Sequence, residues 1–437
     1  MYAPYYNTAE AQKCFLLLPT LVVVLGGLAL SIVAVWIACR RLLKRTAIQL
    51  MKGEEPVRKR KEEKKNSSGG LYTRLIVLNM TSDLKRVIVT IVSIAGCCML
   101  LLIAFMLKYG QDRIPGRQFD EILTFDAELR FDASAETTKE ELSGILDEFG
   151  ADYITVCQKD HLFIYGDKLS ATRVVTVEPD SLPGYYNLRD ARTREELSLT
   201  EHGVLIPLRV HEEFDMQPGT TVTLYDDTMQ QYDAVVDGVF NLYCGRVFFL
   251  SPEGYREIFA DRPVDNCFYI RLNGRELSDL TRAVSDTEGF LNITDATAKR
   301  AQLEKTAAAL NVLIIVMIVI AGLMAFFILV NLSGSYMIHK QKELTIMRIN
   351  GFTVKECTRY AGTELIITTI VGILLGILLG APLGYWIQIM MEASDIQQVR
   401  GADIRSILFS ALITAGFSLI INGMALRKVR TLKLSDI

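Results

Sequence analysis

Five long apolar stretches, separated by polar segments, dominate the pattern of the chain. They lie at residues 14–38, 87–107, 308–332, 363–388 and 404–426. A helix needs about 20 apolar residues to cross a hydrocarbon core roughly 30 Å thick. Soluble helices of that length normally keep a polar face. The pattern therefore predicts an all-α membrane bundle of five transmembrane helices.

The segment between the second and third stretches alternates short β-rich runs with helical ones. Strands are predicted at 153–157, 162–165, 173–177, 204–207, 221–225, 232–240, 247–250 and 267–272, and helices at 139–149, 252–259 and 276–287. Ser251 as N-cap, Pro252 at the first helical position and Glu253 in the first turn predict a sound helix start. A last helix from about residue 296 is expected to run into the third span. This pattern predicts an inserted α/β (α+β) domain.

Charge is divided unevenly between these parts. Segments 40–86, 333–360 and 427–437 carry net charges of +9, +3 and +3, whereas the insert 108–306 carries −16. Short basic segments remain in the cytoplasm. We therefore expect the insert and the N-terminus outside, and the C-terminus in the cytoplasm. The acidic insert suits a cationic ligand, or serves solubility alone.

These patterns divide the chain into ten parts. In order they are an external N-terminal stub (1–13), span 1 with a cytoplasmic tail (14–50), a charged cytoplasmic linker (51–71), an amphipathic entry with span 2 (72–107), the extracytoplasmic domain (108–306), span 3 (307–332), a cytoplasmic loop (333–360), span 4 (361–388), a short external loop (389–403) and span 5 with a cytoplasmic tail (404–437). The linker is either a plain solvated connection or a patch for lipid headgroups.

The first span differs from a signal peptide, because its cations follow the apolar run instead of preceding it. Segments 38–50 and 425–437 share one pattern: an apolar helix end, a pair of cations and a short amphipathic tail. Convergence explains such a pattern as well as duplication does. Under duplication, span 1 closes a preceding unit and the remaining spans form a second, complete unit.

The sequence lacks the motifs of several common nucleotide-binding and hydrolytic sites. The chain contains no P-loop sequence, no zinc-protease helix motif and no serine-hydrolase elbow. Its formal net charge is −3, so the chain as a whole lacks the excess of basic residues that indicates nucleic-acid binding. Cys157, Cys244 and Cys267 in the insert form either one disulfide with a free thiol or three thiols. His161 and His202 are interpreted as surface residues. We expect no catalytic residue, metal site or cofactor in this chain.

The fourth apolar stretch carries a stripe of glycines and one acid. Gly372, Gly376, Gly380 and Gly384 recur every four residues, so they share one helix face and allow another helix to approach closely. The partner is either another span of this chain or a second subunit. The acid, Glu364, is costly in a membrane. It suits a proton relay, or a structural hydrogen bond near the inner boundary.

Segment 339–357 predicts a short amphipathic helix between spans 3 and 4. Glu343, Met347 and Asn350 would share one face, whereas Leu344, Ile346 and Ile349 supply apolar contacts. Gly351 suits a helix C-cap, and Thr353 suits the N-cap of the next helix. Such a helix either docks in a groove of a soluble partner or lies flat on the membrane.

This segment resembles the FtsX-like permeases, the MacB-type (type VII) ABC transporter subunits. The resemblance rests on residues 342–352, which include Glu343 and Arg348, followed by Glu364 and the first glycines of the stripe. The entry to span 2 (78–90) and residues 203–222 of the insert are also similar to the family. Thr345, Asn350 and Pro207 depart from its usual pattern. The similarity covers residues 71–437 as one four-span unit, the C-terminal unit of a two-unit protein.

The resemblance implies a permease of the bacterial cytoplasmic membrane without catalytic activity of its own. A cytoplasmic ABC ATPase dimer, which would hold ATP and Mg²⁺, would dock on a coupling element made of Glu343, Leu344, Ile346, Met347, Arg348, Asn350 and Gly351. Its cycle would move the outer domain by mechanotransmission, for efflux, peptide-antibiotic removal, lipoprotein release or control of a wall hydrolase.

The other partners implied are a second permease unit or copy, membrane lipid, and a peptide, lipid or protein ligand outside. The alternative function is an ATPase-independent receptor or scaffold whose outer domain binds a ligand.

Overall fold

The computed structural model describes residues 17–43, 84–134, 136–166, 168–200, 202–226 and 228–431. The stub 1–13, the linker 51–71, most of the predicted entry to span 2 and the last six residues lie outside these ranges. The chain separates into two units, residues 1–73 and 74–437. In the first unit, one apolar helix, α1 (Leu17–Leu43), includes residues 17–38 of the predicted first span.

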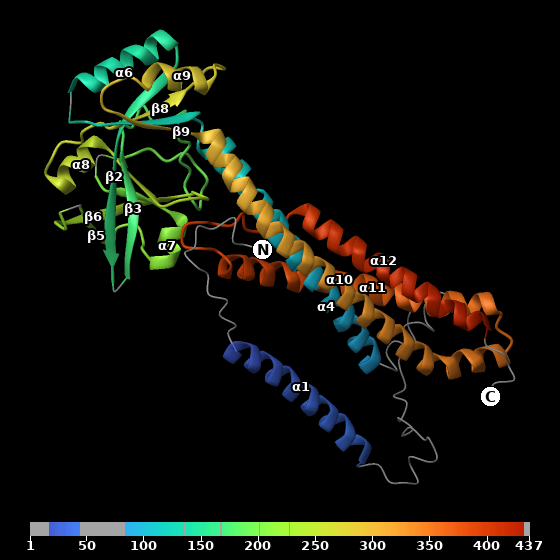
Figure 1. Ribbon diagram of the computed structural model, residues 1–437. Helices are drawn as coiled ribbons and strands as arrows, with labels where there is room; N and C mark the ends of the chain where they lie inside the picture. Colours follow the sequence, from blue (N-terminus) through green and yellow to red (C-terminus); the bar gives the residue numbers. More distant parts are fainter. Residues whose placement is uncertain are drawn as a thin grey trace. The chain divides into compact units, whose positions relative to one another are not determined.

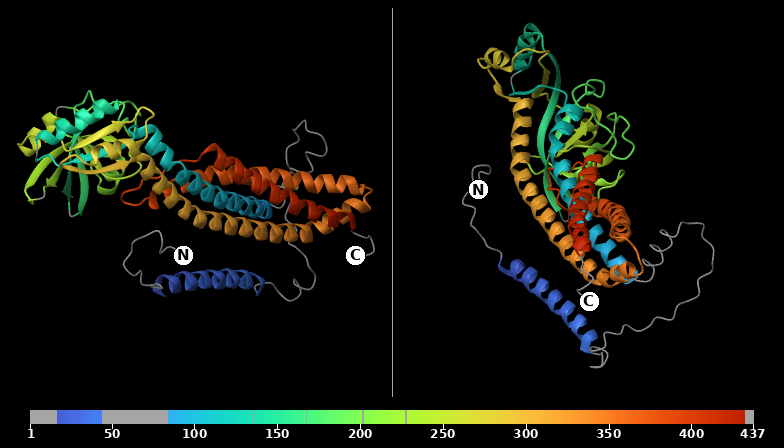
Figure 2. Two further views of the ribbon diagram at one scale, coloured as in Figure 1. Left: turned by 45° about the horizontal axis from the view of Figure 1, so that its top comes forward. Right: turned by 90° about the vertical axis from the view of Figure 1, so that its right-hand side faces the viewer.

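Four helices of the second unit form a bundle. They are α4 (Leu84–Asp112), α10 (Ala296–Ile349), α11 (Val354–Met390) and α12 (Ile404–Thr431). The views of Figures 1 and 2 show them running side by side, with the inserted domain at one end. Each contains a stretch long and apolar enough to cross a membrane. In α1 the described residues contain only a shorter apolar stretch, Val24–Val33, so a count of five spans stays a prediction.

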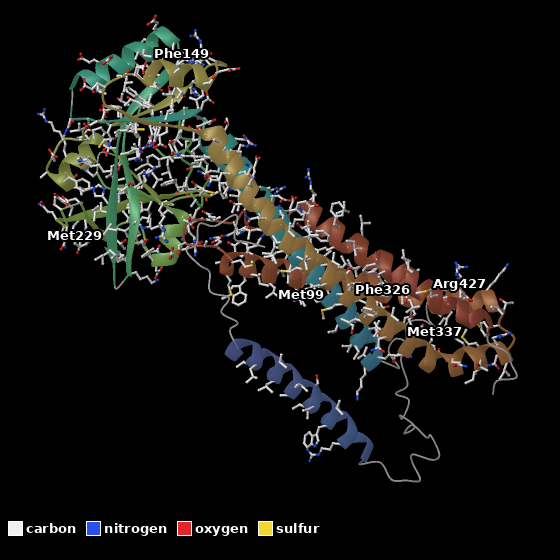
Figure 3. All side chains as sticks on the ribbon, in the orientation of Figure 1. Met99, Phe149, Met229, Phe326, Met337 and Arg427 are labelled. Carbon is white, nitrogen blue, oxygen red and sulfur yellow. The ribbon has the colours of Figure 1, made fainter. Side chains whose placement is uncertain are left out.

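Helix α4 lies at the centre of this bundle and packs against the other three helices. More than half of its most apolar window is buried, against 11% in α10. Apolar side chains of α10, α11 and α12 point outward, as expected for surfaces that face lipid. Other apolar side chains of these helices point into the bundle. Of these, Phe326 of α10 contacts Phe417 of α12 with ring centroids 5.8 Å apart. Phe326 and Met99 are labelled among the bundle side chains in Figure 3.

The inserted domain connects α4 to α10 and contains two lobes. Its elements are α5 (Ile114–Gly116), the π-helix η1 (Arg117–Ile122), β1 (Ala127–Phe131), α6 (Glu136–Phe149), β2 (Asp152–Tyr165), β3 (Lys168–Thr176), β4 (Val204–Pro207), α7 (Leu208–Phe214), β5 (Thr221–Tyr225), β6 (Gln231–Phe240), β7 (Val247–Leu250), α8 (Pro252–Phe259), β8 (Cys267–Arg271), α9 (Leu277–Val284) and β9 (Phe290–Asp295). The α+β prediction is correct for this domain.

The first lobe is a split β-α-β motif. Its strands run in the order β2-β8-β1-β9, all neighbours antiparallel, with α6 and α9 as its helices. Side chains of these two helices share one buried core with the sheet, including Leu142 of α6, Leu280 of α9 and Phe268 of β8.

The second lobe is inserted between β2 and β8. Its pairings run β2-β3-β7-β4-β6-β5 and return to β2, so the six strands close into a small barrel. Closure removes the exposed strand edges that invite aggregation. Strand β2 belongs to both lobes: residues 152–156 pair with β8 and residues 157–165 with β3. The two lobes therefore share a continuous strand.

Several predictions need correction in this domain. The two short strands predicted at 153–157 and 162–165 form the single strand β2, because its pairing continues across the polar residues between them. Strands β1 and β9 and helix α7 were not predicted. His161 is 4% exposed and contacts the Phe259 ring, so it is not a surface residue. The predicted start of α8 is confirmed: the Ser251 hydroxyl accepts a hydrogen bond from the Gly254 N–H.

Candidate functional site

The predicted coupling segment forms the end of α10. This helix begins at Ala296, where the Asp295 carboxylate caps it, and continues without a break for 54 residues. The separate short helix predicted between spans 3 and 4 is therefore wrong. The predicted caps are present: Gly351 follows the helix end with φ +93°, and Thr353 forms a capping box with Glu356 at the start of α11.

The residues predicted to contact a partner differ in exposure. Leu344 is fully buried in the bundle, and Met347 and Arg348 are partly buried. Ile346 and Ile349 expose 58% and 65% of their surface, and Asn350 and Gly351 are also exposed. An exposed apolar pair at a helix end is unfavourable in water, so this tip suits contact with a partner or a membrane surface.

Glu364, the predicted intramembrane acid, lies in a polar cluster between α4, α10 and α11. It is 2% exposed. Its carboxylate pairs with the Arg86 guanidinium at 3.0 Å and with the Lys340 ammonium at 2.9 Å, and accepts a hydrogen bond from the Tyr336 hydroxyl at 3.3 Å. A buried carboxylate needs such partners. The contacts support the structural interpretation of Glu364 over a proton relay.

The same cluster extends to the coupling segment. The Lys340 ammonium, which is completely buried, lies 2.7 Å from the Glu343 carboxylate, and the Tyr360 hydroxyl donates to that carboxylate at 2.9 Å. The Arg86 guanidinium lies over the Tyr336 ring, and the Lys340 ammonium over the Tyr360 ring. We call Arg86, Tyr336, Lys340, Glu343, Tyr360 and Glu364 the helix cluster. It joins the ends of three helices at the level where α10 turns into α11.

Sequence reasoning found Glu343 and Glu364 and missed the other four members of the helix cluster. A signal was present, because Tyr336, Lys340 and Glu343 lie at helical spacing on one face of α10. On α11, Tyr360 and Glu364 are likewise four residues apart. Lys340 lies eight residues beyond an apolar run, where a cation normally indicates only the cytoplasmic side of a span. Its role in the cluster was missed for this reason.

The glycine stripe forms a seam against α4, so the partner left open by the sequence is a span of this chain. A Cβ atom at Gly376 would lie 2.7 Å from the Ala95 carbonyl oxygen and 2.8 Å from the Cys98 Cβ. At Gly372, Gly380 and Gly384 it would lie 2.5 to 3.1 Å from side chains of Ile94, Leu102 and Met106. The two helices therefore touch along four turns with no room for a methyl group.

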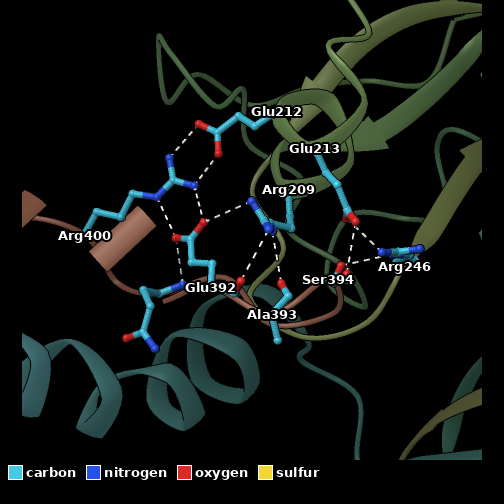
Figure 4. Close-up of polar contacts among 9 residues, drawn as sticks. Arg209, Glu212, Glu213, Arg246, Glu392, Ala393, Ser394 and Arg400 are labelled. Carbon is cyan, nitrogen blue, oxygen red and sulfur yellow. Dashed lines mark hydrogen bonds and ion pairs between the residues drawn. The ribbon is translucent and has the colours of Figure 1, made fainter. Parts of the chain in front are cut away.

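A second polar cluster joins the connection between α11 and α12 to the barrel lobe (Figure 4). The Arg400 guanidinium forms ion pairs with Glu392 at 2.6 Å and with Glu212 of α7. Arg209 of α7 lies 3.6 Å from the Glu392 carboxylate and donates to the Ala393 carbonyl oxygen at 3.0 Å. We call Arg209, Glu212, Glu392 and Arg400 the loop cluster. The Glu392 side chain is completely buried in it.

Further contacts continue this interface beside the loop cluster. Arg246 pairs with Glu213 at 2.8 Å and donates to the Ser394 carbonyl oxygen at 3.0 Å, and the Ser394 hydroxyl donates to Glu213 (Figure 4). The Gly245 N–H donates to the Asp395 carbonyl oxygen. The barrel lobe is thus attached to the α11–α12 connection by both side chains and backbone.

The loop cluster keeps its charges despite burial. Burial by itself lowers the pKa of the Arg400 guanidinium, but hydrogen bonds to Glu212 and Glu392 more than offset this and raise the pKa above its ordinary value. The cluster was missed because α7 and segment 389–403 lie far apart in sequence. Its arginines and glutamates have no spacing that marks them.

Metal-ligating side chains do not gather in the part of the chain that the structure describes: no group of three or more His, Cys, Asp or Glu residues is placed to hold an ion. Cys157, Cys244 and Cys267 are free thiols. Burial raises the pKa of the Cys244 thiol to about 12, so this group stays protonated.

Residues 315–434, which contain most of the bundle and both ends of α11, match the family model described as FtsX-like permease C-terminal. This part of the chain is similar to the C-terminal domain of the FtsX-like permeases. The resemblance found in the sequence is confirmed for it. This match and the four described helices that are apolar and long enough to cross a membrane both support a membrane protein.

Two solved structures are similar to parts of the chain at low levels. One is the extracellular domain of the noncanonic ABC-type transporter YknZ from Gram-positive bacteria, with 14% identity, a TM-score of 0.25 and coverage of 37% of this chain and 90% of that chain. The other is the periplasmic region of MacB from Actinobacillus actinomycetemcomitans, with 10% identity, a TM-score of 0.27 and coverage of 42% and 94%. A comparison with curated proteins finds no significant match.

Proposed function

We propose that this chain is the permease subunit of a bacterial ABC transporter, and that it couples ATP hydrolysis on a partner chain to movement of its inserted domain. The observation that carries this proposal is the continuity of α10. A single helix begins directly after β9 of the inserted domain and ends at the coupling segment. At 1.5 Å per residue it spans about 80 Å.

A continuous helix transmits displacement because its backbone hydrogen bonds hold its length. Force applied at residues 343–353 would reach the inserted domain through α10. The helix cluster ties the same region to α4 and α11, so that the three helix ends move together. Helix α4 leads into the inserted domain beside α10, through α5 and η1, so the inserted domain receives motion from two connections.

The exposed tip around Ile346 and Ile349 is the proposed contact for a cytoplasmic ATPase dimer, which would hold ATP and Mg²⁺. In this arrangement the coupling segment faces the cytoplasm of a bacterial cell, the inserted domain lies outside the cytoplasmic membrane, and the C-terminus is inside. The exposed apolar faces of α10 and α11 are available to lipid and to a second permease unit.

The proposal is tested by purifying the full chain in nanodiscs with the ATPase encoded beside it. We expect Ile346→Asp combined with Ile349→Asp to abolish capture of the ATPase and stimulation of its rate. The matched control is Leu169→Asp, which places the same charge at a 60% exposed apolar site of the inserted domain. These substitutions avoid Glu343, whose removal would disturb the helix cluster.

Capture that the tip variant retains would overturn the proposed contact. If neither wild type nor variants capture an ATPase, the coupling proposal is wrong and the alternative of a receptor or scaffold takes its place.

A further inference from the structure

The inserted domain contains a cavity of about 430 Å³ at its base, a volume typical of small-molecule sites. Its wall combines both lobes with three other parts of the chain. Strands of the two lobes contribute Glu128, Arg173 and Tyr269, α10 contributes Lys299 and Leu303, η1 contributes Phe119, and the α11–α12 connection contributes Ile396. The cavity therefore borders both lobes, α10 and the α11–α12 connection.

One side of the cavity is cationic. The Glu128 side chain, 7% exposed, is surrounded by Lys299 at 2.9 Å, Arg130 at 3.2 Å and Arg173 at 3.9 Å. Arg173 also pairs with Asp160 at 3.0 Å. Three cations thus meet two carboxylates, and the Arg173 and Lys299 side chains remain 36% and 44% exposed. The charged residues that line the cavity are two cations, Arg173 and Lys299, and one acid, Glu128, so the wall carries an excess positive charge that is available to an anion.

Much of the remaining wall of the cavity is apolar. Phe125 and Tyr269 stack with ring centroids 4.5 Å apart, and Phe119, Leu303 and Ile396 complete this wall. Thr306 also lines the cavity and lies just before the apolar stretch of α10 that begins near residue 308. The cavity wall therefore continues to the start of a predicted membrane span.

We propose that this cavity binds an amphipathic anion, with a carboxylate or phosphate headgroup at Arg173 and Lys299 and an apolar chain against Phe119, Phe125 and Leu303. A purely polar anion would leave the apolar wall wet, and a neutral amphiphile would leave the cationic side unmatched. Because Lys299 and Leu303 belong to α10, the inference deepens the proposed function: the ligand would contact the helix that is proposed to transmit motion.

The test uses the full chain in nanodiscs of neutral phosphatidylcholine, with a dansyl-labelled fatty acid as the fluorescent probe. Oleate and lysophosphatidate should displace the probe, and whichever competes better identifies the headgroup. Lysophosphatidylcholine and inorganic phosphate should compete at least about tenfold more weakly, the ratio that one favourable charge contact of about 1.4 kcal/mol gives.

Two variants separate charge from shape. Arg173→Gln combined with Lys299→Gln should weaken probe binding about tenfold or more. Leu303→Trp, which fills the cavity without changing charge, should also abolish binding. Arg282→Gln is the matched control, because it removes a cation that is 81% exposed on α9. Circular dichroism and the thermal midpoint of each variant report whether it folds.

Wild-type affinity in both folded variants, equal competition by lysophosphatidylcholine, or displacement by none of the amphiphiles would overturn the inference. Binding is measured without any ATPase. If the ligand does not bind but the ATPase is captured, the inference is wrong and the proposed function stands. If the ligand binds but no ATPase is captured, only the coupling is refuted.

Discussion

The helix cluster and the loop cluster lie at opposite ends of α11 and are similarly buried, yet they join different kinds of structural element. Lys340 and Glu364 pair at the helix end near Val354, with exposed side-chain fractions of 0% and 3%. Glu392 and Arg400 pair just beyond the other end, with fractions of 0% and 9%. The first pair joins helices that pack along their length, whereas the second joins a loop to the surface of another lobe.

This difference determines which cluster is able to open. If α10 and α11 separated, Lys340 and Glu364 would be left as isolated charges between helices, which costs several kcal/mol for each ion. If the barrel lobe left the α11–α12 connection, Glu212 and Arg400 would be hydrated by water on both surfaces. We therefore expect the helix cluster to be permanent and the loop cluster to be a reversible attachment of the inserted domain.

The largest expected effect is that of Lys340→Met. The substitution leaves Glu364 with Arg86 and Tyr336, but it removes a buried charge and the cation that pairs with Glu343, so we expect a loss of about 3 to 5 kcal/mol in stability. The measurement is thermal unfolding of the chain in nanodiscs. Lys355→Met, at an exposed position on α11, is the control.

A second variant strengthens this test. Adding Glu343→Gln to Lys340→Met should recover part of the loss, because the carboxylate that lost its cation is then neutral. An unchanged unfolding midpoint in Lys340→Met would show that the helix cluster does not hold the three helices together.

The seam between the two clusters is tested by Gly376→Ala. The added methyl group would meet the Ala95 backbone at 2.7 Å, and backbone cannot move aside as a side chain can, so we expect a loss of about 1 to 3 kcal/mol. The same substitution at Gly416 of α12 has nothing within 4 Å and should stabilise the helix by about 0.5 to 1 kcal/mol. Equal effects at both sites would argue against close packing of α4 and α11.

The loop cluster is tested by Arg400→Gln. The global unfolding midpoint should change little, because both partners of Arg400 become hydrated when the interface opens. Hydrogen exchange in α7 and residues 391–403 should rise by about tenfold, which corresponds to about 1.4 kcal/mol of local opening free energy. Exchange in α6 is the internal control. A large global loss with no local change would mean that this cluster is as permanent as the helix cluster.

The smallest effect concerns the ion pairs of Glu128, which lie at the cavity. Burial by itself raises the pKa of this carboxyl, but Lys299, Arg173 and Arg130 more than offset it, and the pKa is lower than its ordinary value. A depressed pKa means that the carboxylate stabilises the fold above about pH 4.5 and that this contribution is lost as the pH falls through the folded-state pKa.

Replacing Glu128 by Gln should therefore cost on the order of 1 kcal/mol at neutral pH, and the difference from wild type should disappear in acid. Urea unfolding followed by tyrosine fluorescence at several pH values measures it. A difference that does not depend on pH would assign the effect to packing instead of charge.

Much of the architecture was readable from local patterns. The apolar runs of α4, α10, α11 and α12, the start of α8 at Ser251 and the caps at Gly351 and Thr353 each depend on a few neighbouring residues. Strand β1 was missed although its apolar residues alternate with Glu128 and Arg130, a pattern typical of a strand. Arg130 pairs with Glu128, which is also matched by Arg173 of β3 and Lys299 of α10. Strand β9 pairs only with β1 at the sheet edge, and its burial pattern lacks a buried residue.

The sequence by itself determined which segments are apolar enough for a membrane and the spacing of the glycine stripe, because hydrophobicity and helix periodicity are local properties. Only the tertiary structure decided that the stripe faces α4, that Lys340 reaches Glu364, and that Arg400 meets Glu212 of α7. These contacts join residues far apart in the chain, and their stability depends on burial and partners that no local pattern specifies.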